Sequence, residues 1–358
     1  MRSICLLVML SAQWATAAGW TVSYFFDDPR EVLHFTDIAF PSADRGIAVG
    51  VIVDELGMRR PRNVAMVTAD SGKNWAQVKL SDAPYSVFFL DDSNGWMVTE
   101  QGIWKTDESG RTWKRLSKHS PGSLERVWFL DSNHGFAIGQ EKTVLETKDG
   151  GKTWKPVKAA KEPTGNPDFA AYTQISFLNS QVGLIAGSAI PPVPRGFNLT
   201  GRQVPTMTIQ LQTNDGGVTW KPSSAPLLGE ITGIELHGTL GLLLFTYSRQ
   251  FEVPSEVYRL NTRGGDTVSS FRSRNRRVTD MALFDGHAFL AAVEPPRLAK
   301  EAAELPGKIH VLESTDLKEW TEMPVDYRAN GAQPLIAGHD PQHMFLATDN
   351  GMILRFIP

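Results

Sequence analysis

Acidic side chains recur in this sequence at one place in a repeated turn, and carboxylates are the groups that hydrolases and metal sites use. Asp70, Asp149, Asp215 and Asp316 each follow a Thr or Ser by two residues, and Glu108 takes the same place in a further copy. Two such acids could cleave a glycosidic bond, and several together could hold a cation. An active site needs its acid once, however, so a repeated acid indicates a structural role.

Two histidines, His339 and His343, are four residues apart beside Asp340, a spacing that metal ligands can have. The segment aligns with polar turns that follow the first apolar run of other repeats. We therefore expect a hairpin at this place and no metal site. The aligned turns are residues 91–95, 131–135 and 179–183.

The acids belong to one eight-residue pattern, Ser/Thr-x-Asp-x-Gly-x-Thr-Trp. Copies occupy residues 68–75, 106–113, 147–154 and 213–220, a shortened copy occupies 314–320, and a degenerate one lies around 261–268. We expect each carboxylate to accept hydrogen bonds from its own turn, the glycine to allow positive φ, and the tryptophan to pack between repeats. The residues interpreted as structural are Asp70, Trp75, Glu108, Trp113, Asp149, Trp154, Asp215, Trp220, Asp316 and Trp320.

Four short alternating or apolar runs accompany each copy, which indicates four-stranded units that stack on one another. We predict an all-β fold, a seven-bladed β-propeller. The predicted blades lie near residues 33–80, 84–117, 123–158, 172–223, 230–271, 277–324 and 333–358. The last has only three strands, so we expect the run Trp20–Phe26 to close the ring as its fourth strand, which leaves no open sheet edge between blades.

The pattern resembles the Asp-box, or bacterial neuraminidase, repeat, and the chain as a whole resembles the photosystem II assembly/stability factor family of propellers. That resemblance implies a non-catalytic scaffold that binds another protein, and members of the family use a basic patch for protein contact. Two alternatives stay open: a glycoside hydrolase of the sialidase-like class, and a propeller that binds a carbohydrate or small ligand. The chain lacks the Arg-Ile-Pro segment expected of a sialidase, which disfavours an enzyme. We expect no cofactor and no metal.

The first 18 residues read as a signal peptide, because Arg2 precedes an apolar run from Ile4 to Leu10 and small residues follow. We expect the propeller, residues 19–358, to be exported to the periplasm or beyond the cell. The run is far shorter than the ~20 residues of a membrane-spanning helix. Cys5, the only cysteine, lies inside this leader. A formal net charge of -3 shows no basic excess of the kind that nucleic-acid binding favours.

Four blades lengthen the connection between their second and third strands, at residues 54–62, 190–205, 248–254 and 294–307. These connections share one face of the disc with the links between blades, and loops on a rigid scaffold often carry binding groups. With the link from blade five to blade six, the first three of these connections supply ten arginines suited to carboxylates or phosphates. The connection at residues 294–307 is not part of this trend, because its Arg297 lies among acidic residues. We predict that this face binds a protein partner with an anionic surface. The candidate residues are Arg59, Arg60, Arg62, Arg195, Arg202, Arg249, Arg272, Arg274, Arg276 and Arg277.

Overall fold

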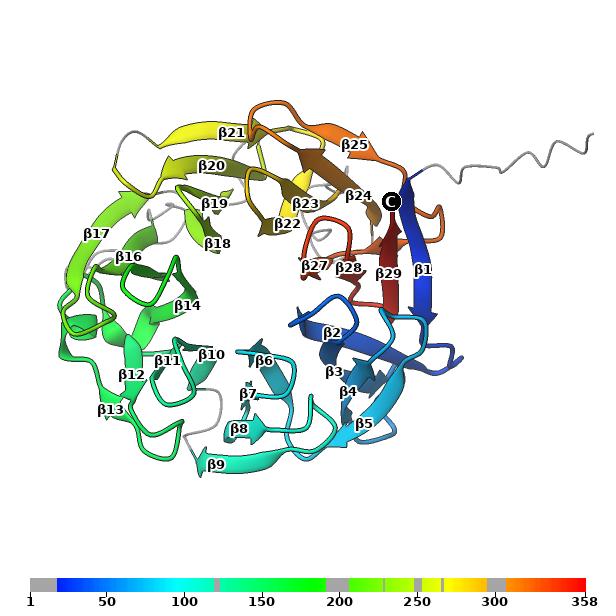
Figure 1. Cartoon of the computed structure of the whole chain (residues 1–358), viewed down its shortest axis with the longest axis horizontal. Helices are drawn as coiled ribbons and strands as arrows, with labels where there is room; N and C mark the ends of the chain where they lie inside the picture. Colours follow the sequence, from blue (N-terminus) through cyan, green and yellow to red (C-terminus); the bar gives the residue numbers. More distant parts are fainter. Residues whose placement is uncertain are drawn as a thin grey trace, which may run out of the picture.

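The computed structural model describes residues 18–118, 123–190, 206–227, 229–247, 253–264, 267–294 and 307–358. They form seven β-sheets arranged in a ring around a central channel (Figure 1). Their helical content is confined to two short 3-10 helices, η1 (Lys158–Lys161) and η2 (Pro167–Phe169). None of these described residues forms a helix with the length and apolarity needed to span a membrane. The all-β, seven-bladed propeller expected from the sequence is therefore confirmed.

Each sheet is one blade of antiparallel strands, and the first strand of each blade lines the channel. Blade 1 contains β2 (Glu31–Ala39), β3 (Gly46–Asp54), β4 (Arg62–Thr68) and β5 (Ala76–Leu80), and blade 2 contains β6 (Pro84–Phe89), β7 (Gly95–Thr99), β8 (Gly102–Thr106) and β9 (Lys114–Lys118). Blade 3 contains β10 (Leu124–Phe129), β11 (Gly135–Gly139), β12 (Thr143–Thr147) and β13 (Lys155–Pro156), and blade 4 contains β14 (Ala170–Phe177), β15 (Gly183–Ala189), β16 (Thr206–Thr213) and β17 (Lys221–Leu227). Blade 5 contains β18 (Gly229–His237), β19 (Leu240–Tyr247), β20 (Ser255–Asn261) and β21 (Val268–Arg272). Blade 6 contains β22 (Arg277–Leu283), β23 (Ala288–Val293), β24 (Gly307–Ser314) and β25 (Thr321–Met323), with the short β26 (Asn330–Gly331) also paired to β24, and blade 7 contains β27 (Leu335–Gly338), β28 (Met344–Ala347) and β29 (Met352–Ile357).

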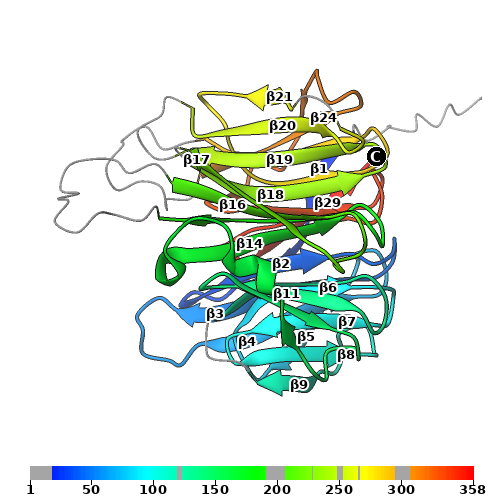
Figure 2. The ribbon, with the colours of Figure 1, turned by 90° about the vertical axis from the view of Figure 1, so that its left-hand side faces the viewer.

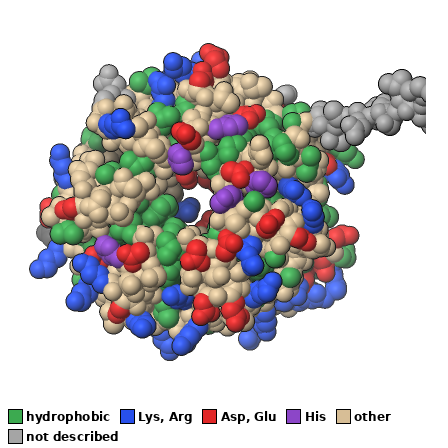
Figure 3. All heavy atoms as spheres, viewed as in Figure 1, with side chains coloured by type: hydrophobic (Ala, Val, Ile, Leu, Met, Phe, Trp, Pro, Cys, Tyr) green, Lys and Arg blue, Asp and Glu red, His purple; other side chains and the backbone are tan. Residues whose placement is uncertain are grey.

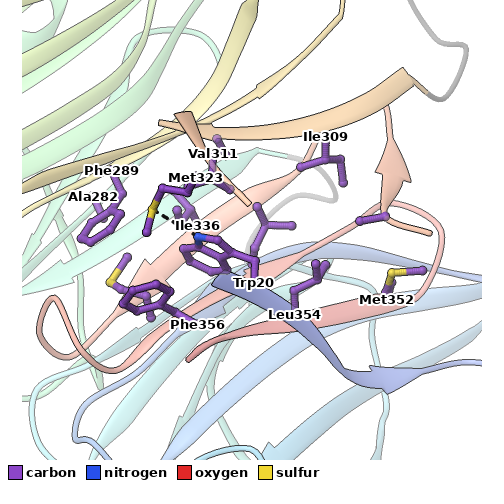
Figure 4. Close-up of a cluster of buried hydrophobic side chains, with 14 of the residues drawn as sticks. Trp20, Ala282, Phe289, Ile309, Val311, Met323, Ile336, Met352, Leu354 and Phe356 are labelled. Carbon is purple, nitrogen blue, oxygen red and sulfur yellow. Dashed lines mark hydrogen bonds between the residues drawn. The ribbon is translucent and has the colours of Figure 1, made fainter. Parts of the chain in front are cut away.

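The fourth strand of blade 7 is β1 (Gly19–Phe25), from the other end of the described chain. It pairs antiparallel with β29, from Gly19 opposite Ile357 to Phe25 opposite Met352. Trp20 is only 1% exposed. Its indole N–H donates to the sulfur of Met323 (3.4 Å), and its ring lies in the core cluster between blades 6 and 7 (Figure 4). The pairing is the ring closure that the sequence predicts.

In four blades a phenylalanine ring packs over a glycine at the hairpin between the first and second strands. In blade 3, a Cβ atom at Gly135 would lie 2.7 Å from the ring of Phe129, so only glycine lets this ring lie over the start of β11. The same arrangement relates Phe40 to Gly46, Phe89 to Gly95 and Phe177 to Gly183. It keeps these hairpins tight.

The strand order sorts the connections onto two faces of the disc. The Asp-box face carries the first-to-second hairpins and the Asp-box turns, and on it histidine and acidic side chains lie around the mouth of the channel (Figure 3). The loop face carries the second-to-third connections and the links between blades. The β3–β4 hairpin projects from this loop face (Figure 2). Each lengthened connection predicted from the sequence joins a second strand to a third strand, so all four begin and end on the loop face.

Candidate functional site

The Asp-box carboxylates are engaged within their own turns. Asp149 accepts the hydroxyl of Thr153 (2.6 Å) and the backbone N–H of the same residue (2.8 Å), and these bonds hold the pKa of Asp149 at about 2. The hydroxyl of Thr147 donates to Asp149 and accepts the N–H of Gly151 (2.9 Å), a role that the sequence analysis did not assign. A carboxyl with so low a pKa is ionised at neutral pH, so it cannot serve as the general acid of a glycosidase.

The other copies use the same chemistry. Asp70 and Asp215 accept the backbone N–H groups of Asn74 and Thr219, each at 2.9 Å. In the shortened copy Asp316 accepts the N–H groups of Lys318 (2.8 Å) and Glu319 (2.9 Å). Glu108 instead accepts the hydroxyl of Thr112 (2.7 Å).

The closing tryptophans pack against aromatic rings. Trp75 contacts Phe345 of blade 7 edge-on at 6.2 Å between ring centroids, and Trp220 contacts Phe136 of blade 3 at 5.4 Å. Trp154 contacts Phe129 at 6.1 Å. Trp320 contacts Phe271 of the preceding blade, whereas Trp113, like Trp154, contacts a phenylalanine of its own blade, Phe89. The ring contacts of Trp75, Trp220 and Trp320 therefore join neighbouring blades, and those of Trp113 and Trp154 lie within one blade.

The β3–β4 hairpin presents apolar side chains at the edge of the loop face. The carboxylate of Asp54 accepts the backbone N–H groups of Met58 (2.6 Å) and Arg59 (3.2 Å), and Gly57 takes a positive φ of 66°. These contacts fix the tip of the hairpin. At this tip Leu56 is 69% exposed and Met58 is 84% exposed.

Two of the three arginines in this hairpin fold back onto blade 1. Arg59 pairs with buried Glu31 at 3.1 Å, and Arg62 pairs with its other carboxylate oxygen. Arg60 is exposed. The segment also contains Asp54 and Glu55, so the three positive charges of Arg59, Arg60 and Arg62 are offset nearby. The tip is therefore better described as an apolar surface with mixed charge than as a basic patch.

The second group of candidate arginines lies at the link from β21 to β22, also on the loop face. Arg277 donates to the carbonyl of Ala332 (2.6 Å), and Arg276 donates to Glu322 (3.1 Å). Arg272 and Arg274 complete the group. Blade 7 separates this group from the arginines of blade 1, so the seven candidates among the described residues lie in two groups. Arg195, Arg202 and Arg249 lie outside the described residues.

A buried histidine links the charges beside Arg276. His310, 3% exposed, contacts Glu322 through Nδ1 and Glu294 through Nε2 (3.2 Å), and Arg276 also approaches Glu294 at 3.9 Å. Burial alone would raise the pKa of Glu322, but His310 and Arg276 lower it below its ordinary value. Sequence reasoning missed this network because its members belong to no repeat.

A buried carboxylate organises the loop-face end of blade 5. Glu256, 4% exposed, accepts the hydroxyls of Tyr247 (2.7 Å), Tyr258 (2.9 Å) and Ser269 (2.5 Å). Burial favours the neutral form, yet these donors and nearby Arg272 lower the pKa of Glu256 overall. Arg272 thus contributes to the interior of this blade.

Four charged side chains line the central channel, a cavity of about 180 Å³. Burial raises the pKa of Glu235 to about 8, helped by the charge of Asp280, and raises the pKa of Asp280 to about 6. Arg126 lies 3.9 Å from Asp37 across the same channel. Asp37 and Asp280 each accept the backbone N–H of the next inner strand at 2.8 Å, which ties neighbouring blades together.

The segment around His339 and His343 forms the hairpin between β27 and β28, as expected from the sequence. His343 contacts the carboxylate of Asp340 at 2.9 Å. Within the part of the chain that the structure describes, no three His, Cys, Asp or Glu side chains gather closely enough to hold a metal ion.

Comparison of sequences relates the chain to photosystem II assembly factors. The family described as photosynthesis system II assembly factor YCF48 matches residues 123–192. The chain is 31% identical over 149 residues to the chloroplastic photosystem II stability/assembly factor HCF136 of Oryza sativa subsp. japonica, a match that covers 40% of this chain and 30% of that protein. It is 24% identical over 148 residues to the photosystem II assembly lipoprotein Ycf48 of Nostoc sp., covering 34% of this chain and 42% of that protein. The matched part is less than half of either relative.

Two solved structures share the fold along nearly the whole chain. The structure described as YCF48 bound to D1 peptide has a TM-score of 0.61 and 17% identity, and the match covers 95% of this chain and 97% of that one. YCF48 from Cyanidioschyzon merolae gives the same TM-score and identity, with 95% and 99% covered. At this identity the likeness concerns the fold. With the family match, it confirms that the chain is an Asp-box propeller resembling the photosystem II assembly factors.

Proposed function

We propose that this chain is an exported, non-catalytic propeller that binds another protein through its loop face, in the manner of an assembly or stability factor. The likeness to photosystem II assembly factors supports this class of function, and one structural neighbour is described as bound to a peptide. The observation that carries the proposal is the projecting hairpin of blade 1, where Leu56 and Met58 are 69% and 84% exposed. Large apolar side chains held in solvent by a fixed turn are typical of a binding surface.

Hydrogen bonds within the hairpin hold its tip in one shape. Asp54 holds the backbone of residues 58 and 59 through two hydrogen bonds. A partner that covers Leu56 and Met58 would therefore lose little free energy to ordering of this loop. The neighbouring arginines Arg59 and Arg60 fit the rim of such a contact, where guanidinium groups pair with carboxylates of the partner.

A second apolar site lies on the loop face at blade 4. Phe169 is 62% exposed and Ile190 is 42% exposed, and the N–H of Ile190 donates to the carbonyl of Phe169 (3.1 Å), so the two residues lie side by side. Buried Lys142 donates to the carbonyls of Pro163 (2.5 Å) and Gly165 (2.9 Å) and fixes the segment before Phe169. A broad partner surface could contact both apolar sites across the ring.

The test is affinity capture of the partner with the tagged chain, from the periplasmic or secreted fraction of the source cell. Proteins are crosslinked chemically before lysis. The double variant Leu56→Ser/Met58→Ser should lower the affinity for the specific partner by about thirtyfold, because each exposed apolar side chain contributes on the order of 1 kcal/mol when buried, about 2 kcal/mol together. Arg60→Glu should weaken capture less than the double variant does. Its effect should be larger at low salt than at high salt, because salt screens the charge.

The matched control is Val218→Ser, since Val218 is 74% exposed but lies on the Asp-box face. It should leave capture unchanged. Equal recovery of the partner by the wild type and the Leu56→Ser/Met58→Ser variant would remove the hairpin from the binding site.

A further inference from the structure

A pocket of about 390 Å³ opens on the loop face between blades 6 and 7. Val22 and Phe25 of β1 and Met352 of β29 form one wall, and Arg328 and Asn330 of the β25–β27 link form the other. Met352 also belongs to the core cluster of Figure 4, so the pocket reaches from the surface to the core. Phe25 is 51% exposed at its mouth.

The polar side chains at the pocket already have partners. Arg328 makes two bonds to Asp326, at 2.9 and 2.7 Å, and the side-chain amide of Asn350 donates to that of Asn330. Beside them the ring of Tyr327 is 89% exposed. Because the polar groups are satisfied within the protein, the surface left to an incoming group is mostly apolar.

An open strand edge adjoins the pocket. The N–H of Trp20 donates to Pro324 (2.8 Å) and its carbonyl accepts the N–H of Asp326 (2.9 Å), a parallel pairing between β1 and the β25–β27 link. The pairing of β1 with β29 is regular from Gly19 to Val22 and shifts after Val22. Because N–H groups two residues apart in a regular strand point the same way, the N–H of Val22 also points outward. Beyond Trp20 the link diverges, and no backbone group among the described residues pairs with this outer edge of β1.

We propose that an extended segment of the partner protein adds beside β1 and places a large aliphatic or aromatic side chain in this pocket. The backbone of the segment takes up the pairing that residues 324–326 begin, and its side chain lies between Phe25 and Arg328. The pocket would bind one apolar side chain of the segment, and the edge of β1 would pair with its extended backbone. This inference rests on the proposed function, since it names the kind of segment that the partner supplies.

The experiment measures binding of fluorescein-labelled octapeptides to the full chain by fluorescence polarisation. The probes are Ser/Thr-rich peptides with Leu, Phe or Ser at one central position, together with a Leu peptide that is N-methylated at alternate amides. The Leu and Phe peptides should bind about tenfold more tightly than the Ser peptide, as expected for burial of one large apolar side chain. N-methylation should abolish this advantage, because it removes the backbone donors.

Phe25→Ser and Tyr327→Ser should each reduce the affinity for the Leu peptide toward that for the Ser peptide, and Val218→Ser on the Asp-box face should not. Both altered side chains are at least half exposed, so the variants should fold. Equal affinities of the Leu and Ser peptides, absence of binding by either, or full affinity in Phe25→Ser would overturn the inference.

The hairpin variant Leu56→Ser/Met58→Ser separates this inference from the proposed function. It should bind the Leu peptide normally while capturing much less of the partner than the wild type does. If that variant retains the partner and Phe25→Ser loses it, the hairpin assignment fails and the pocket stands. If the reverse holds, the pocket fails and the hairpin stands.

Discussion

Glu235 gives the channel a titratable group whose charge opposes folding. The ordinary pKa of its carboxyl is 4.5, and burial raises it to about 8 in the folded chain. Between these two values the folded state holds a proton that the unfolded state releases. The free energy of unfolding therefore falls as pH rises from about 4.5 to 8.

Glu235→Gln removes this titration and should stabilise the protein at pH 8, by on the order of 1–2 kcal/mol, since the channel admits water and weakens the full effect. Urea unfolding at several pH values measures the change, with Glu230→Gln on the exposed side of the same strand as the control. The idea is wrong if both variants retain the pH dependence of the wild type.

Single residues also show where sequence reasoning succeeds and where it stops. The turn role of Asp149 could be predicted because the repeat supplies several copies of one local geometry. His310 and Glu322 could not be paired in advance, since they lie 12 residues apart on neighbouring strands and no other blade repeats them. Their contact depends on the pairing of β24 with β25.

At the level of strands and loops, the aromatic residue at the end of a first strand and the glycine that opens the second form a unit. Gly135→Ala would place a Cβ atom 2.7 Å from the ring of Phe129. We expect a loss of about 1–3 kcal/mol in stability, as overpacking of a dense core produces. Adding Phe129→Leu should recover part of it. Denaturant unfolding of both variants decides the matter, and additive losses would contradict this explanation.

Lys142 holds the link between blades 3 and 4. It is 2% exposed, and burial lowers the pKa of its ammonium group, yet it donates to two carbonyls of the blade 3–4 link. Lys142→Met should leave these carbonyls without their donor and destabilise the link by roughly 1–3 kcal/mol. Hydrogen exchange of residues 158–169 should accelerate, whereas exposed Lys148→Met should leave it unchanged. If hydrogen exchange of residues 158–169 is unaltered in Lys142→Met, the link between blades 3 and 4 does not depend on Lys142.

The sequence could place the lengthened loops on one face, because each falls at the same step of a four-stranded blade. It could not show that Arg59 and Arg62 fold back onto Glu31, nor that Arg277 donates to a carbonyl of the next link. A count of arginines in the sequence does not show which carboxylates and carbonyls lie beside them in the folded chain. Among the described candidates, Arg59, Arg62 and Arg277 therefore have partners within the chain that their spacing in the sequence does not show.

For the whole ring, closure depends on β1. Trp20→Ala should cost about 3–5 kcal/mol, because it empties a fully buried site between blades 6 and 7. Thermal unfolding should show a clear drop in Tm, with exposed Thr21→Ala close to the wild type. Limited proteolysis should then cut first in blade 7. A variant as stable as the wild type would mean that the β1–β29 pairing alone holds the ring.

Blade count and closure were accessible from the sequence because Trp20–Phe26 is a strand-like run without a partner nearby, and blade 7 lacks a strand. The pocket beside Phe25 was not accessible. It arises where residues 324–326 pair with Trp20 and then diverge, and no local pattern records that divergence.

Gly19 stands directly opposite Ile357 in the last sheet. A linker of a few residues could therefore join these positions without disturbing the pairing, and new ends could be cut at the two-residue turn between β7 and β8. Such a circular permutant would hold blade 7 by a continuous backbone and blade 2 by strand pairing alone. A comparison of its Tm with that of the parent protein would show whether blades 2 and 7 contribute equally to the stability of the ring.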